Sequence, residues 1–243
     1  MESNNIVSGE NLEKKQIKSF TKYVNIKADY FLQKVFDNLK KKRTLEIVKN
    51  NKNIKKRINL NINDYKEYSE KYSSIEIEIK PVNNKSGKFI NIKEEDEKFY
   101  HIYFNNKEEE IKRNYINKDE DIKIIKIIIN YKIESFENLF KDCKCIETIY
   151  FKKFFRNNIN NMGYMFSGCS SLKELNLNNF NTNNVTNMGF MFDGCSSLKE
   201  LNLNNFNTNN VTYMRGMFYG CSNELIMEIK TQYKNINKKA FEN

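Results

Sequence analysis

The chain has 243 residues, enough for one or two domains, with 39% hydrophobic residues and a formal net charge of +10. The chain has one His, one Pro and no Trp. The single His excludes most Cys/His zinc sites and leaves one candidate for histidine-based catalysis. No apolar run reaches the ~18–20 residues of a membrane-spanning helix, and residues 1–9 have no apolar signal core. We therefore expect a cytoplasmic protein without a membrane span, with a surface or secreted protein as the alternative.

The N-terminal part of the chain is basic. Residues 1–20 are polar and aperiodic, which predicts a disordered lead, and residues 21–73 are predicted to form a basic helical segment. Between Lys14 and Ile58, 15 Lys and Arg residues stand against three acidic ones. No aromatic residues alternate with these charges, which argues against nucleic acid as a partner. The densest basic runs are candidate contacts for some other anionic partner: Lys40, Lys41, Lys42, Arg43, Lys55, Lys56 and Arg57.

Residues 74–118 are predicted to form a small antiparallel β region. Isoleucine and glutamate alternate strictly from Ile75 to Ile79, which is the period of a half-buried strand, and Pro81 ends the pattern. Residues 88–92 and 99–104 are predicted to be two further strands. His101 lies in the last of these, without a nucleophile or second ligand nearby in the sequence, so we expect a surface or packing residue.

Residues 119–222 repeat with a period of 26. Cys143, Cys169, Cys195 and Cys221 recur at this constant interval, and the units 167–192 and 193–218 are nearly identical in sequence. A fixed period of this length is typical of a solenoid, in which each unit buries its apolar side against the next. We expect the cysteines to form a column of buried, reduced thiols rather than disulfides or a metal site.

Within each unit, leucines alternate with polar residues, which predicts a short strand. The spacing of Met188, Met191 and Phe192 predicts a helical turn that closes the unit. Residues 223–243 are predicted to be a helical cap, with Leu225, Met227, Ile229 and Tyr233 over the last unit.

The outward-facing strand positions are the candidate partner-binding surface, because the alternating leucines are expected to be buried. These positions are Tyr150, Glu174, Asn176, Asn178, Glu200, Asn202 and Asn204.

The repeats carry a family resemblance. The segment MFDGCSSLKELNLNNFNTNNVT, residues 191–212, resembles the BspA-type leucine-rich repeat, and the likeness extends over residues 122–222. The resemblance implies a right-handed stack of strands used as a protein-binding surface. Family members occur in bacterial surface proteins and in microbial eukaryotes, and characterised relatives are similar to adhesins that bind host matrix proteins.

A second resemblance concerns residues 28–58, whose apolar spacing is similar to that of the F-box. It implies a module that docks substrate receptors onto a cullin-type ubiquitin ligase. An ordinary pair of amphipathic helices has the same spacing, so both interpretations stay open.

The predicted fold class is α+β: a small N-terminal helical segment and an antiparallel sheet, followed by a short leucine-rich-repeat β/α solenoid with a C-terminal helical cap. No phosphate loop, nucleophile elbow, zinc helix or kinase signature is present, so we expect no catalysis, no cofactor and no metal. The predicted function is non-catalytic protein–protein recognition through the solenoid surface. The alternatives are an F-box-like adaptor, a secreted adhesin, and anion or nucleic-acid binding through the basic helices.

Overall fold

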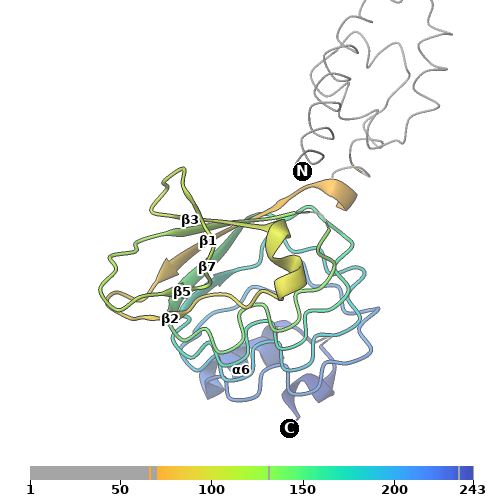
Figure 1. Ribbon diagram of the computed structural model, residues 1–243. Helices are drawn as coiled ribbons and strands as arrows, with labels where there is room; N and C mark the ends of the chain where they lie inside the picture. Colours follow the sequence, from red (N-terminus) through yellow and green to blue (C-terminus); the bar gives the residue numbers. More distant parts are fainter. Residues whose placement is uncertain (1–65, 67–69, 131, 235, 243) are drawn as a thin grey trace, which may run out of the picture. The chain divides into compact units, whose positions relative to one another are not determined.

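The computed structural model describes residues 66, 70–130, 132–234 and 236–242 (Figure 1). The chain divides into two compact units, Met1–Tyr68 and Ser69–Asn243, and nearly all described residues belong to the second. The predicted disordered lead, most of the predicted basic helical segment, the F-box-like segment and the seven candidate anion-binding residues lie outside the described residues.

One mixed six-stranded sheet organises the second unit, with strand order β4-β3-β6-β1-β7-β8. Neighbouring strands are antiparallel, except that β7 and β8 are parallel. A separate two-stranded sheet pairs β2 (Gly87–Lys88) with β5 (Tyr115–Ile116). The six strands are β1 (Ile75–Pro81), β3 (Tyr100–Phe104), β4 (Glu110–Ile111), β6 (Ile125–Ile129), β7 (Ile146–Lys153) and β8 (Glu174–Asn176).

The sheet has one buried and one polar face, as the alternation in its sequence predicts. Ile75, Ile77 and Ile79 of β1 are buried, while Glu76 and Glu78 between them are partly exposed. The same alternation places Ile125, Ile127 and Ile129 of β6 in the core. An antiparallel sheet with this pattern packs one face on the core and leaves the other in water.

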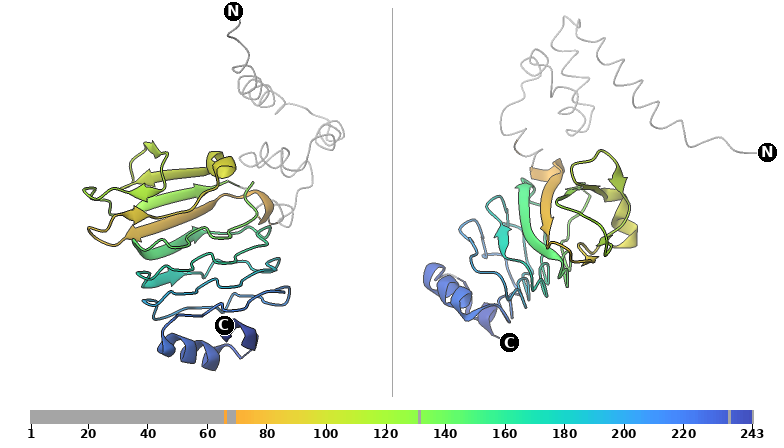
Figure 2. Two further views of the ribbon diagram at one scale, coloured as in Figure 1. Left: turned by 60° about the horizontal axis from the view of Figure 1, so that its bottom comes forward. Right: turned by 90° about the vertical axis from the view of Figure 1, so that its left-hand side faces the viewer.

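Beyond β7 the 26-residue units stack on one another (Figure 2). Parallel bridges connect one equivalent position in successive units: Ser135 to Asn161, Asn161 to Asn187, and Asn187 to Tyr213. Backbone N–H groups donate to the next unit, as Phe140 does to Met165 and Phe166 to Met191. Inside, Phe140, Phe166, Phe192 and Phe218 form a column of nearly parallel rings with centroids 5.7 Å apart.

The predicted fold class is wrong. Most of the regular secondary structure in the described residues is β, and its main part is one mixed sheet. No β/α solenoid with a strand and a helix in each unit is found among these residues. Helical structure among them is limited to η2 (Glu94–Phe99), α6 (Asn223–Gln232), η3 (Lys238–Phe241) and the α-helical residues 66 and 70–72. The predicted antiparallel sheet is not separate from the repeats either, because β1 pairs on one side with β6 and on the other with β7.

The expected helical turn in each unit fails for a backbone reason. Phe192 donates its N–H to Met217 of the next unit, so this group does not bond within a helix. Phe190 and Gly194 also have positive φ, at 53° and 68°, and the equivalent positions in the other units share this left-handed backbone. Such a backbone ends a helical turn, and it strains a bulky residue such as Phe190 more than a glycine.

The predicted C-terminal cap is reduced to α6 and η3. Ser222 accepts a hydrogen bond from Leu225 N–H and caps α6, and Leu225 and Ile229 are buried as predicted. Met227 is 70% exposed, so its predicted contact with the last unit is wrong. A helix buries one stripe, and residue 227 lies two positions from both buried residues, which puts it on the opposite side.

Among the described residues, no helix is both long and apolar enough to cross a membrane.

Candidate functional site

A row of polar side chains in register crosses the outer face of the sheet. Facing residues of paired strands carry their side chains on the same face, so this row continues from the antiparallel strands to the first repeats. Its members are Glu110, Tyr103, Lys126, Glu78, Tyr150 and Asn176.

On the antiparallel strands this face is covered by ion pairs. Lys152 lies 3.3 Å from Glu78. Glu147 accepts from Lys80 and Lys173, each at 2.9 Å, and these two lysines hold the pKa of the Glu147 carboxyl below its usual range. Most charges here therefore already have partners of opposite sign.

A groove of about 770 Å³ begins where these ion pairs end. All seven predicted partner-binding residues line it: Tyr150, Glu174, Asn176, Asn178, Glu200, Asn202 and Asn204. Its other lining residues are Lys173, Leu175, Lys199, Leu201, Glu228, Gln232 and Tyr233. The structure thus brings together residues from β7, β8, the following unit and the end of α6, which are far apart in the chain.

One end of the groove is fixed by a short hydrogen bond. The Tyr150 hydroxyl donates to Glu174 Oε2 at 2.5 Å. This bond, with a smaller contribution from burial, raises the pKa of Tyr150, because ionisation would place a phenolate beside a carboxylate. Tyr150 is therefore a neutral donor to the carboxylate of Glu174, and the two side chains act as a pair rather than independently.

Asparagines form the middle of the groove. Asn176 and Asn202 are equivalent in successive units, and the side chain of each accepts a hydrogen bond from the backbone N–H two residues later, at 3.0 Å. Asn202 Nδ2 also donates to Asn178 Oδ1 at 3.2 Å. These bonds hold the carboxamides in place while leaving donors and acceptors facing the groove.

The wall formed by α6 is the part that the sequence pattern did not reveal. Tyr233 was expected to cover the last unit, and its hydroxyl indeed accepts a hydrogen bond from Leu203 N–H at 3.0 Å. Glu228 and Gln232 lie one turn apart on α6 and are joined by a side-chain hydrogen bond of 2.8 Å. Only the i, i+4 spacing of these two polar residues signalled that they share a face.

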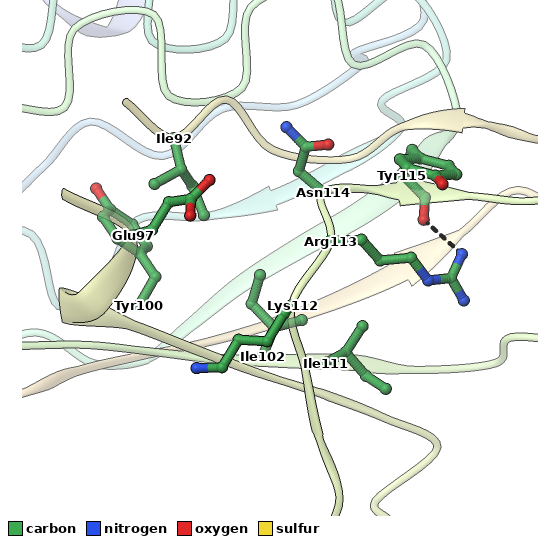
Figure 3. Close-up of a pocket in the computed structure, with 9 residues that line it drawn as sticks. All are labelled: Ile92, Glu97, Tyr100, Ile102, Ile111, Lys112, Arg113, Asn114 and Tyr115. Atoms are coloured by element: carbon green, nitrogen blue, oxygen red, sulfur yellow. Dashed lines mark hydrogen bonds between the residues drawn. The ribbon is translucent and has the colours of Figure 1, made fainter. Parts of the chain in front are cut away.

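A smaller pocket of about 200 Å³ lies at the opposite end of the sheet, near β4 (Figure 3). Ile92, Ile102 and Ile111 line its centre, and Glu97 and Lys112 lie around it (Figure 3). Arg113 is turned aside, where it donates to the Tyr115 carbonyl at 2.9 Å and forms a two-bonded ion pair with Glu120. This volume is below the usual range of small-molecule sites, so the groove is the better candidate.

The cysteines give no reactive centre among the described residues. All five are buried and unpaired, and the thiols of Cys169, Cys195 and Cys221 point to phenylalanine carbonyls of the preceding unit at 3.0–3.2 Å. Burial raises the pKa of Cys169 and of Cys221 to about 12, so these thiols stay protonated at neutral pH.

The single histidine belongs to an ion-pair cluster. His101 Nδ1 lies 3.0 Å from Glu110, which also binds Lys112 at 2.5 Å. No group of three or more His, Cys, Asp or Glu residues that could hold a metal ion occurs in the part of the chain that the structure describes.

Residues 134–242 match the family model described as Mycoplasma protein of unknown function, DUF285. The matched segment contains the stacked units and the C-terminal segment with α6, and it is under half of the chain. It includes every residue that lines the groove but none of the strands that precede β7. Searches among curated proteins and among solved structures gave no match.

Proposed function

We propose that the protein is a non-catalytic recognition protein and that the groove between β7, the following units and α6 binds a segment of a protein partner. The observation that carries the proposal is the gathering of all seven outward-facing residues, from Tyr150 to Asn204, in this one groove. The resemblance of residues 122–222 to the BspA-type repeat, a protein-binding family, supports it.

The chemistry of the groove favours binding over a covalent reaction. Its lining has no His, Cys, Ser or Thr, and Glu174 and Lys173 are engaged by Tyr150 and Glu147. Carboxamides present donors and acceptors that match the backbone of an extended peptide. A long polar groove with a tyrosine at each end suits a chain-like partner better than a small substrate.

The proposal is tested by quantitative capture with the full chain as bait, in extracts of its own organism. The groove variant is Asn178→Arg/Glu200→Arg, at two exposed positions of the groove. The control variant is Glu137→Arg/Asn209→Arg, which makes the same residue changes at exposed positions away from the groove.

We expect at least one protein to bind the wild type and the control equally and the groove variant about tenfold more weakly. A buried guanidinium without a partner costs more than the free energy of a tenfold change in affinity, about 1.4 kcal/mol. The captured protein is then purified and its affinity for the three baits measured directly. Equal affinity for all three would contradict the proposal, and circular dichroism checks that the variants fold alike.

A further inference from the structure

Two columns of aromatic rings run through the stacked units and end differently. The column of Phe140, Phe166, Phe192 and Phe218 is continued by Phe241 of η3, whose ring centroid lies 5.3 Å from that of Phe218. In the second column, Phe206 stacks on Phe180 at 6.0 Å, with the rings 4° from parallel. Among the described residues no further ring stacks on Phe206. The C-terminal segment therefore completes one column and leaves the other unfinished.

A pocket of about 320 Å³ lies beside Phe206. Its apolar lining is Leu203, Phe206, Met214, Met217 and Ile236, joined by the ring of Tyr233. Gln232, also in the lining, stands one full repeat period after Phe206, where the repeat would continue with another phenylalanine. The volume is in the range of ligand sites, and methionines adapt readily to an aromatic guest.

The charge at the pocket rim selects the kind of aromatic group. Lys234 lines the pocket and is exposed. Among the described residues, Lys234 is the only charged residue in the lining of this pocket. A carboxylate next to the aromatic group would therefore be favoured, whereas a cationic neighbour would be repelled.

The pocket adjoins the groove. Asn204, Gln232 and Tyr233 line both. A segment that lies along the Asn176–Asn202 row therefore reaches the pocket at the end formed by Tyr233.

We propose that this pocket, named here the aromatic pocket, binds an aromatic side chain with an adjacent carboxylate, presented by the partner segment that occupies the groove. The inference rests on the proposed function, since the groove brings the segment to the pocket. It supplies the apolar anchor that the asparagine-rich groove lacks, because binding energy in interfaces concentrates on buried aromatic residues. The partner is thus an extended segment with one aromatic residue and an adjacent carboxylate near the end that meets α6.

The absence of tryptophan in the chain provides a direct test. Two probes, N-acetyl-tryptophan and N-acetyl-tryptophanamide, differ only in the carboxylate, and their indole fluorescence is free of any protein indole. We expect both emission spectra to shift to the blue on titration with the full chain. The carboxylate probe should bind about threefold more tightly at low salt, as expected for one partly exposed ion pair.

Two variants decide whether the aromatic pocket is the site. Thr208→Phe places a ring in the aromatic pocket at a residue that does not line the groove, and it should abolish binding of both probes. Lys234→Gln, at an exposed position, should make the two probes bind equally. The control Glu137→Arg/Asn209→Arg should bind as the wild type does. Absence of a spectral shift in the wild type, or a carboxylate preference that survives in Lys234→Gln, would overturn the proposal.

Capture experiments separate this inference from the proposed function. The inference is supported if the partner that depends on Asn178 and Glu200 is also lost with Thr208→Phe, which changes the pocket lining but not the groove lining. If that partner is retained by Thr208→Phe, the aromatic pocket is not its anchor, and the groove proposal stands alone. If no partner depends on the groove at all, the proposed function fails, although the probe titrations can still succeed.

Discussion

The polar face of the sheet differs between the antiparallel strands and the stacked units. On β1 and β7, lysine faces glutamate, as in Lys152 with Glu78 and Lys153 with Glu76. On the stacked units, asparagine faces asparagine, as in Asn202 with Asn178. The polar surface is thus stabilised by ion pairs on the antiparallel strands and by carboxamides on the stacked units that follow β8.

The difference follows from the repeat itself. Strands of different sequence can set opposite charges side by side, whereas identical units put each residue type next to its own copy. Lys173 and Lys199 share one position and Glu174 and Glu200 another, and like charges at neighbouring positions are unfavourable. A carboxamide carries both a donor and an acceptor, so it is the polar group that pairs with itself. The repeat end therefore keeps unneutralised charge and free amides, which a partner can use.

The largest expected effect is in the aromatic column of the stacked units. Phe192→Ala removes a fully buried ring between Phe166 and Phe218 and should lower the free energy of unfolding by about 3–5 kcal/mol. Urea unfolding measures it. Phe155→Ala, at a 50% exposed position in the preceding unit, is the control and should cost much less. A loss below about 1 kcal/mol at Phe192 would mean that the units do not depend on this column.

A smaller loss is expected where one unit hydrogen-bonds to the next. Buried Thr182 accepts from Asn207 N–H at 2.7 Å and donates to the Asn207 carbonyl at 3.1 Å. Thr182→Val leaves both groups without this partner and should cost about 1–3 kcal/mol. Thr208→Val changes the equivalent residue of the last unit. Among the described residues Thr208 has no equivalent pair of hydrogen bonds, so this change should lower the free energy of unfolding less. Equal losses in thermal unfolding would show that contact between units is not the cause.

The stability contributed by the ion pair of Arg113 and Glu120 should decrease at low pH. The Arg113 guanidinium holds the pKa of Glu120 well below its ordinary value of 4.5, at about 2. A lowered folded-state pKa stabilises the protein above pH 4.5 and loses this contribution as the pH falls towards 2. The stability difference between wild type and Glu120→Gln should therefore be largest near neutral pH, shrink below pH 4.5 and vanish towards pH 2. A difference that is constant from pH 7 to pH 3 would contradict the assignment.

The smallest expected effect concerns exposed ion pairs. Lys152→Gln removes the contact with Glu78. The side chains of Lys152 and Glu78 are both more than one third exposed, so the free energy of unfolding should change by at most about 0.5 kcal/mol. The change should shrink further in 0.5 M salt, because exposed pairs are screened. A larger, salt-insensitive loss would mean that the lysine stem contributes packing rather than charge.

Much of the site could be predicted from local pattern. The alternation around Leu175 and Leu177 identified Glu174, Asn176 and Asn178 as outward-facing, and the 26-residue period extended the set to Glu200, Asn202 and Asn204. The structure brings these residues into one groove with Tyr150. Their binding role stays a prediction.

The errors arose where long-range contacts decide the structure. Nothing in the Ile75–Ile79 pattern indicates that β1 lies between β6 and β7, so the predicted separation of sheet and repeats was wrong. The spacing from Met188 to Phe192 suited a helical turn, but only a single turn bond, from Met191 N–H to the Met188 carbonyl, forms there. The N–H groups of Met188 and Phe192 donate to the next unit instead. The wall formed by Glu228, Gln232 and Tyr233 depends on where α6 docks, which helical periodicity alone does not specify.

Carboxyl footprinting of the complex with the captured protein tests the central claim most directly. Glu174, Glu200 and Glu228 line the groove, while Glu137 and Glu224 lie outside its lining and are exposed, so they serve as internal references. Carbodiimide-driven amidation of the full chain is compared with and without the partner. The account predicts that the three groove carboxylates lose labelling while the references keep theirs. Protection of Glu137 or Glu224 with unchanged labelling in the groove would show that another surface binds the partner.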